Sequence, residues 1–166
     1  MRNRPLLAGA HSLLEVVDAR NRPFCRLAAS LVREQRLVHR EICLVVESGP
    51  HILLAAGPQG WDFFARAPVV AGASLLESAE ALAGERDLAS CRPRELGTLP
   101  PCPATEQAFV SLFMLRVTPS RLLLLAEDAA TRLLLDQEEF RGLARHGGEL
   151  LSPLVRHAVL ESDLLG

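Results

Sequence analysis

The sequence predicts an α/β fold in which a mixed β-sheet lies between helices. Three observations indicate this class. Apolar segments of strand length recur along the chain, helix-capping signals precede amphipathic segments, and turn residues separate the two kinds of segment. Because there is no internal repeat, low-complexity tract or linker, we expect one layered domain.

The first predicted strand covers residues 12–18 and ends in an Asn- and Pro-containing turn at residues 19–23. Residues 41–47 are rich in β-branched side chains, which is typical of a buried strand. Ser48-Gly49-Pro50 is a turn signal, so residues 51–56 should return as the second strand of a hairpin. Two further strands are expected at residues 94–99 and 108–117, on either side of a proline-rich loop.

The clearest helix prediction covers residues 74–88. Ser74 is a candidate N-cap and Glu77, three residues later, completes a capping box. Leu75 and Leu82 fall on one helical face, whereas Gly84 weakens the last turn by about 1 kcal/mol relative to alanine. Further helices are predicted at residues 28–36, 136–146 and 153–162, and residues 122–126 fit either a strand or a helix.

Length, composition and charge limit the number of domains, the partners and the location that we expect for the protein. The chain has 166 residues, 49% of them hydrophobic, so we expect a single domain over residues 1–166, with residues 1–11 as a loose N-terminal segment. The net charge is −2 and no long basic cluster is present, which argues against nucleic-acid or anionic-membrane partners. Without a signal peptide, an 18-residue apolar segment or paired cysteine spacing, a cytoplasmic location is expected.

All 18 basic residues are arginine, so catalysis by a Schiff-base lysine or a P-loop lysine is excluded. The four cysteines lack CxxC spacing and the five histidines are scattered, which disfavours both a zinc site and a covalent Cys/His mechanism.

Several strings, in this order, resemble the Nudix hydrolase superfamily, and in particular the branch that includes isopentenyl-diphosphate isomerase. The resemblance covers roughly residues 12–160 in a single domain. It implies a Nudix-type α/β/α sandwich with a mixed sheet. The strings are Leu14-Glu15-Val16-Val17-Asp18 with Asn21, Leu37-Val38-His39-Arg40, Gly60-Trp61-Asp62, Glu138-Glu139-Phe140 and Leu151-Ser152-Pro153.

The segment that follows Trp61 departs from the Nudix box, whose family form is GX5EX7REUXEEXGU with U a bulky aliphatic residue. Gly72 is kept, but the glutamate after it is Ala73. The "RE" pair becomes Ala81 and Leu82, and the "EE" pair becomes Glu85 and Arg86. The paired glycines and histidine of "GGH" become Arg66, Ala67 and Pro68, and the closing glycine becomes Leu88.

One carboxylate is a weak anchor for Mg²⁺, which prefers several oxygen ligands in octahedral geometry. The resemblance therefore implies a catalytically silent Nudix-fold protein without a cofactor. It would bind a nucleotide, another diphosphate-like ligand or a protein partner, and a homodimer is the family habit. We also expect Arg86 or Arg66 to occupy the space of the metal and to pair with Glu85.

The alternative is a divergent hydrolase that cleaves a nucleoside-diphosphate-type substrate with Mg²⁺ or another divalent metal. Glu85 is its residual catalytic and metal-binding candidate, and Glu139 could supply a base from outside the box. Each has a plainer interpretation: Glu85 as a solvated helix residue, and Glu138 and Glu139 as an acidic first turn of a helix. Glu80 and Asp87, seven residues apart, could share a helical face as a shifted metal pair or simply as an acidic surface.

The ligand-binding candidates are Trp61, Arg66 and Arg86. Trp61 could stack on a base, although a lone tryptophan beside two phenylalanines is more often part of a core or a pocket wall. Arg66 with Arg92 and Arg94 could form an anion-binding patch, although scattered surface arginines are the more common case.

Overall fold

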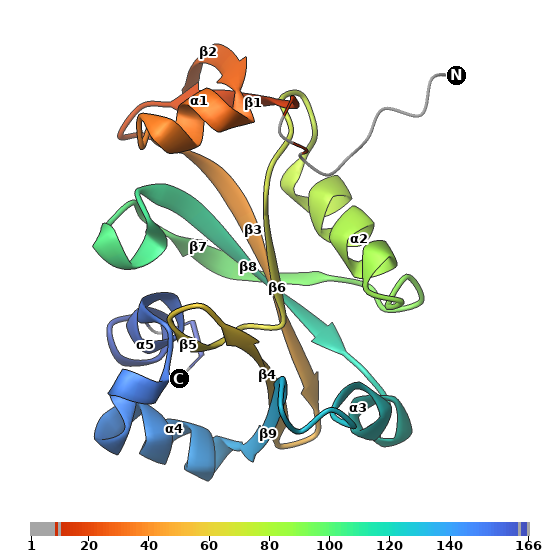
Figure 1. The fold of residues 1–166 in the computed structure, drawn as a ribbon. Helices are drawn as coiled ribbons and strands as arrows, with labels where there is room; N and C mark the ends of the chain where they lie inside the picture. Colours follow the sequence, from red (N-terminus) through yellow and green to blue (C-terminus); the bar gives the residue numbers. More distant parts are fainter. Residues whose placement is uncertain (1–8, 10, 163, 166) are drawn as a thin grey trace.

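The sheet is built around one parallel pair of strands. The computed structural model describes residues 9, 11–162, 164 and 165. Strand β3 (His39–Ser48) runs parallel to β8 (Ala108–Arg116), from the His39–Ala108 pair to the Glu47–Arg116 pair (Figure 1). Most side chains of both strands are buried, as expected for a parallel pair covered on both faces.

Five strands form the path β5-β4-β3-β8-β7, and two more pair beside it. Two strands pair with the edge of β3 that faces away from β8. Strand β6 pairs antiparallel with the first half of β3, and β4 pairs antiparallel with its last three residues. Strand β9 then extends the sheet by pairing with β4. The bounds of these strands are β4 (His51–Gly57), β5 (Gly60–Asp62), β6 (Ala65–Pro68), β7 (Arg94–Leu99) and β9 (Arg132–Asp136).

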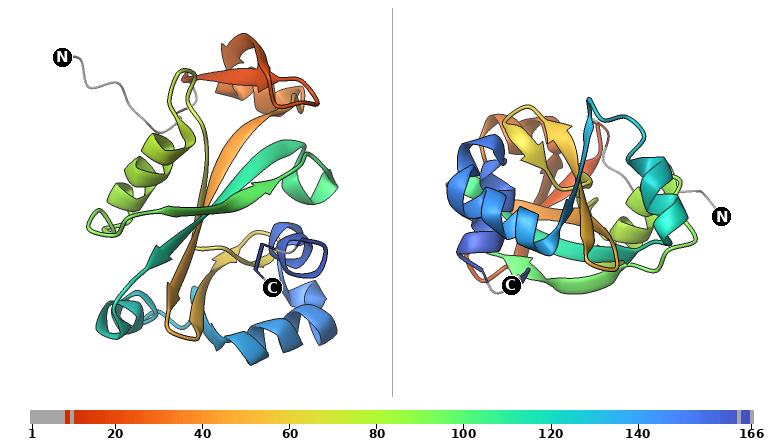
Figure 2. Two further views of the ribbon diagram at one scale, coloured as in Figure 1. Left: turned by 180° about the vertical axis from the view of Figure 1, so that it is seen from behind. Right: turned by 90° about the horizontal axis from the view of Figure 1, so that it is seen from below.

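Helices cover both faces of this sheet (Figure 2). Because side chains alternate along a strand, odd- and even-numbered residues of β3 enter different cores. Cys43 and Val45 belong to a core under α4 and α5, which we call the α4-side core. Leu44 and Val46 belong to a core under α2 and α3, the α2-side core. The helices are α2 (Leu75–Glu85), α3 (Pro119–Leu125), α4 (Gln137–His146) and α5 (Pro153–Leu160).

A small N-terminal unit lies at one end of the sheet. Strands β1 (Leu13–Val17) and β2 (Pro23–Ala28) form an antiparallel pair, and α1 (Ala29–Glu34) follows directly. Val32 of α1 packs with Leu14 and Val16 in a third, separate apolar cluster. Arg40 of β3 ties this unit to the sheet by donating from Nε to Asn21 Oδ1 at 2.7 Å.

The expected α/β class with a mixed sheet is confirmed. The strands expected at residues 12–18, 41–47, 51–56, 94–99 and 108–117 correspond to β1, β3, β4, β7 and β8. Residues 122–126 lie mostly in a helix, because Thr118 caps α3 and Pro119 occupies its first turn. Strands β2, β5, β6 and β9 were not predicted.

Helix α2 ends at Glu85, before the predicted residue 88. Asp87 has a left-handed φ of 58°, which a helix cannot continue through, so Glu80 and Asp87 do not share a helical face. The N-terminal segment expected over residues 1–11 falls largely outside the described residues.

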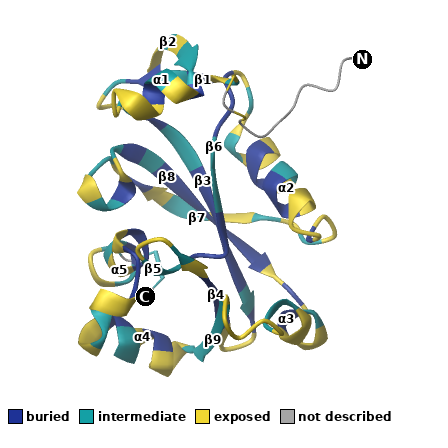
Figure 3. Ribbon diagram, viewed as in Figure 1, coloured by how far each residue is buried: buried dark blue, intermediate teal, exposed yellow. Residues whose placement is uncertain are grey.

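No helix in the described part of the chain is long and apolar enough to cross a membrane. Burial in Figure 3 follows the layers: the sheet and the inward faces of the helices are buried, and the outward helix faces are exposed.

Candidate functional site

Helix α2 carries the segment that resembles a Nudix box, and its first acidic residue is used for capping. Ser74 Oγ accepts a hydrogen bond from the Glu77 backbone N–H at 3.1 Å, and the Glu77 carboxylate accepts one from the Ser74 N–H at 2.8 Å. The bond from the Ser74 backbone lowers the pKa of Glu77. The predicted capping box is confirmed, and Glu77 is committed to the helix end.

The residues at the other box positions do not fit a divalent metal. Leu82 is 2% exposed and packs in the α2-side core, at the position where the resemblance would place a metal-binding glutamate. Glu85 and Arg86 are exposed at the C-terminal end of α2. Across the described residues, no three His, Cys, Asp or Glu side chains converge as metal ligands.

Glu139 is also engaged at a helix end. Its carboxylate accepts from the Asp136 N–H at 2.8 Å, and Asp136 Oδ1 accepts from the Glu139 N–H at 2.8 Å, which completes a capping box for α4. Because α4 packs in the α4-side core and α2 in the α2-side core, Glu139 and Glu85 belong to helices on opposite faces of the sheet. The structure does not bring the two catalytic candidates together.

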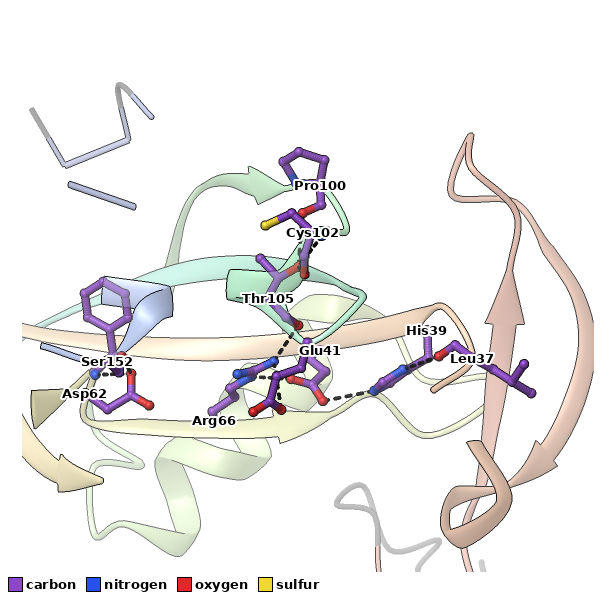
Figure 4. Close-up of polar contacts among 11 residues, drawn as sticks. Leu37, His39, Glu41, Asp62, Arg66, Pro100, Cys102, Thr105 and Ser152 are labelled. Carbon is purple, nitrogen blue, oxygen red and sulfur yellow. Dashed lines mark hydrogen bonds and ion pairs between the residues drawn. The ribbon is translucent and has the colours of Figure 1, made fainter. Parts of the chain in front are cut away.

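Arg66 has a different partner from the one expected. It lies on β6 opposite Cys43, while Glu41 lies opposite Pro68, so Arg66 and Glu41 are diagonal neighbours on one face of the sheet. Arg66 Nε donates to Glu41 Oε2, and Arg66 Nη2 donates to the Thr105 carbonyl at 2.9 Å (Figure 4). The expected pairing of Arg66 with Glu85 is therefore wrong, and Arg86 makes no ion pair with Glu85 in the described structure.

His39 completes the cluster from the other side of Glu41. Its Nδ1 lies 2.9 Å from the Leu37 carbonyl oxygen and its Nε2 lies 2.9 Å from Glu41 Oε1. A carbonyl and an ionised carboxylate can only accept, so both ring nitrogens must carry a proton. The geometry therefore selects the imidazolium form, and His39, Glu41 and Arg66 form a cation–anion–cation cluster.

The cluster is largely shielded from solvent. The side chains of His39, Glu41 and Arg66 are 7%, 12% and 21% exposed. Burial alone would lower the pKa of His39, but the hydrogen bonds to Glu41 and to the Leu37 carbonyl outweigh it and raise that pKa. Burial would raise the pKa of Glu41, but His39 and Arg66 outweigh it and lower that pKa.

Cys43, the next residue on this face of β3, is not a nucleophile. The thiol is fully buried, and burial raises its pKa well above the ordinary value, with a further contribution from Asp62. A protonated, buried thiol is inert as a nucleophile.

A cavity of about 590 Å³ opens beside the cluster, between α1 and the short 3₁₀ helix η1 (Pro103–Thr105). We call it the α1–η1 cavity. His39 and Glu41 form part of its wall. Its volume is within the range of small-molecule sites. The lining of the cavity also includes Arg33, Arg36, Glu106 and Gln107.

The remaining ligand-binding candidates lie elsewhere. Trp61 of β5 is half-buried against the α4-side core, and its carbonyl accepts a hydrogen bond from the Ser152 N–H at 2.8 Å. Arg86 lies at the end of α2, on the other side of the sheet from the α1–η1 cavity. Of the predicted site residues, only Arg66 belongs to the cluster beside this cavity.

Glu41 is not among the site residues expected from the sequence, and His39 and Arg40 enter there only through the string Leu37-Val38-His39-Arg40. In the structure Arg40 has a structural role, because it holds the β1–β2 turn. A signal for His39 and Glu41 was present, because Glu41 begins the strand predicted at residues 41–47 and an extended chain from His39 would place the two side chains on one face.

The comparisons with known proteins bear on the fold. No protein-family model matches the chain. No curated protein matches it either. Among solved structures, the chain is similar to DR0079 from Deinococcus radiodurans, with a TM-score of 0.66 and 16% sequence identity. The match covers 91% of this chain and 99% of DR0079, so the two proteins share the overall α/β fold.

Proposed function

We propose that this protein is a non-catalytic relative of the Nudix hydrolases that binds a nucleotide or another diphosphate-like ligand. The observation that carries the proposal is Leu82, which lies buried in the α2-side core at the place of a metal-binding carboxylate. A metal that polarises a diphosphate and generates the attacking hydroxide has no oxygen cage there.

The hydrolase alternative has less support. Glu85 is exposed at the end of α2, and Glu77 and Glu139 are both occupied by capping boxes. A two-carboxylate site would need these residues to converge, whereas α2 and α4 cover opposite faces of the sheet.

A ligand-binding role is supported by the α1–η1 cavity and the charged cluster that forms its wall. A protein partner or a second copy of the chain is the other candidate. It is favoured by Leu123 and Leu124 of α3, which are 63% and 53% exposed. A cytoplasmic location is consistent with the four cysteines, all of which are free thiols.

Two measurements test the proposal. Phosphate release is followed across a panel of nucleoside diphosphate derivatives with Mg²⁺ or Mn²⁺, and no turnover above the buffer rate is expected. The melting temperature is then measured with the same compounds in EDTA, where a binder should be stabilised by its ligand. Metal-dependent turnover that Glu85→Gln abolishes would show that the protein is a hydrolase.

The partner alternative is separated by the oligomeric state. Light scattering during gel filtration is compared for wild type and Leu124→Glu. A dimer that the substitution dissociates would assign the exposed face of α3 to self-association, and an unchanged monomer would remove that assignment.

A further inference from the structure

We propose that the α1–η1 cavity is the ligand site and that it takes a phosphate or diphosphate group on Arg33, Arg36 and His39. The proposal rests on the proposed function for the kind of ligand, and it adds the place and the residues that hold it. It moves the binding site away from the degenerate box, to the other face of β3.

The cavity's position follows from strand alternation. His39 and Glu41 line it and lie on the same face of β3 as Cys43, which belongs to the α4-side core. Helix α2 packs against the even-numbered residues of β3, on the opposite face. A ligand in the cavity would therefore be separated by the sheet from Glu85 and Arg86.

The charges in and behind the cavity wall favour an anion. Arg33, Arg36, His39 and Arg66 are four cationic groups, against the two carboxylates Glu41 and Glu106. Glu106 is 66% exposed and 3.9 Å from Arg66, so it is well screened by solvent. Arg33 and Arg36 are exposed like Glu106, whereas His39 and Arg66 are largely shielded, so the balance leaves excess positive charge along a concave surface, where it attracts an anion such as phosphate.

Glu41 is not available to bind a cationic ligand. Each of its carboxylate oxygens already accepts from a charged donor, Oε1 from His39 and Oε2 from Arg66. Its role is to hold His39 in the doubly protonated form, which makes Glu41 a positioning residue. The free donors at the cavity are instead on Arg33 and Arg36, whose guanidinium groups have no hydrogen-bond or ion-pair partner among the described residues.

The backbone around the cavity is held in uncommon conformations. Arg36, Glu106 and Gln107 have φ values of 50°, 55° and 66°, and all three line the cavity. Only two other non-glycine residues in the described chain, Asn21 and Asp87, have positive φ. Such residues concentrate at ligand sites, where the surrounding structure holds them in place. The Thr105 hydroxyl holds the η1 side of the cavity in place, because it accepts a hydrogen bond from the Cys102 N–H at 2.9 Å.

The test is calorimetric binding of inorganic pyrophosphate and ADP, in EDTA and low salt at pH 6, to wild type and to arginine variants. We expect Arg33→Gln and Arg36→Gln each to weaken binding about tenfold, because each removes a charge-assisted hydrogen bond. Arg141→Gln, an exposed arginine of α4, is the matched control and should bind as wild type does. Arg86→Gln tests the rival position at the degenerate box.

Three outcomes distinguish the cavity assignment from the proposed diphosphate-binding function. Loss in the Arg33 and Arg36 variants alone supports the α1–η1 cavity. Loss in Arg86→Gln alone overturns the cavity assignment but leaves a diphosphate-binding function standing. Absence of binding to wild type by every compound overturns the ligand part of the proposed function together with this site.

Two further measurements test the site without the arginine variants. In amide spectra of the wild type, pyrophosphate should shift residues 33–39 and 106–107 and leave the end of α2 unmoved; the reverse pattern would overturn the assignment. The ratio of pyrophosphate affinity between wild type and His39→Gln should also fall as the pH rises and His39 loses its proton, with Glu41, Arg66, Arg33, Arg36 and Glu106 as the surrounding charges. Because the ionisation of pyrophosphate is common to both proteins, a ratio that does not change with pH would exclude the charge of His39 from the site.

Discussion

Ser152 Oγ, the cap of α5, donates a hydrogen bond to Asp62 Oδ1 at 2.9 Å and so joins two segments that lie 90 residues apart. The same hydroxyl accepts from the Val155 N–H at 3.2 Å, and the Ser152 backbone N–H donates to the Trp61 carbonyl. The last helix is thereby fixed to the end of β5.

Ser152→Ala should therefore cost more than the loss of a helix cap alone. We expect a loss of about 2 kcal/mol of unfolding free energy, from one cap and one part-buried hydrogen bond to a carboxylate. Thr118→Ala removes the exposed cap of α3, whose hydroxyl accepts from the Arg121 N–H, and should cost about 1 kcal/mol. Urea unfolding of both variants measures the difference, and equal costs would show that the bond to Asp62 contributes nothing.

The second prediction concerns the Glu41–Arg66 pair. Arg66→Met leaves a carboxylate that is 12% exposed without one of its two cationic partners, so we expect a loss of about 3 kcal/mol. Arg22→Met breaks the ion pair with Asp18, in which both side chains are more exposed, at 68% and 34%, so the loss should be much smaller.

A double-mutant cycle checks the cause. Arg66→Met combined with Glu41→Leu should cost less than the sum of the two single changes, because the double variant removes both charges of the pair and leaves neither without its partner. Additive costs in the cycle would contradict a direct interaction between the two side chains.

The third prediction is a pH dependence of stability from His39. Its folded pKa lies above the ordinary value of 6.5, so its charge stabilises the protein fully below pH 6.5. That contribution is lost as the pH rises through the folded pKa. Glu41 acts in the opposite sense, because its folded pKa lies below 4.5: its contribution is present above pH 4.5 and is lost on acidification.

Urea unfolding of wild type and His39→Gln at several pH values measures the His39 contribution. The difference between the two proteins should be largest near pH 5.5 and should shrink by pH 9. A constant difference across this range would mean that His39 does not change charge on unfolding. Titration of the His39 ring by NMR gives the folded pKa directly.

The fourth prediction concerns Leu82, where the resemblance to the Nudix box would place a metal-binding glutamate. Leu82→Glu places a carboxylate in the α2-side core, where Leu82 is 2% exposed, so we expect a loss of about 3 kcal/mol or more and no gain of metal binding. Ala81→Glu, at a half-buried position of the same helix, should be tolerated. Melting temperatures are measured with and without Mg²⁺. A Mg²⁺-dependent rise in the melting temperature of Leu82→Glu would show that a carboxylate at this position can bind the metal.

Residues that lie close together in the sequence were enough to predict part of the fold. The capping box of α2 needs only Ser74 and Glu77, three residues apart, and it forms as predicted. Strand β6 escaped prediction because Ala-Arg-Ala-Pro has no β-branched residue, and its extended form comes from pairing with β3. Strand β9 escaped for a related reason: its run of leucines fits a helix as well as a strand, and pairing with β4 decides between them.

The sequence by itself determined which elements could form and that Ala73 and Leu82 stand where the resemblance would place glutamates, because both depend on residue identity within a few positions. Only the tertiary structure decided where the charges meet. Glu41 and Arg66 are 25 residues apart and become neighbours through the register of two strands. The α1–η1 cavity likewise depends on α1 and η1 meeting beside β3, since packing brings distant segments together in a way that no local pattern records.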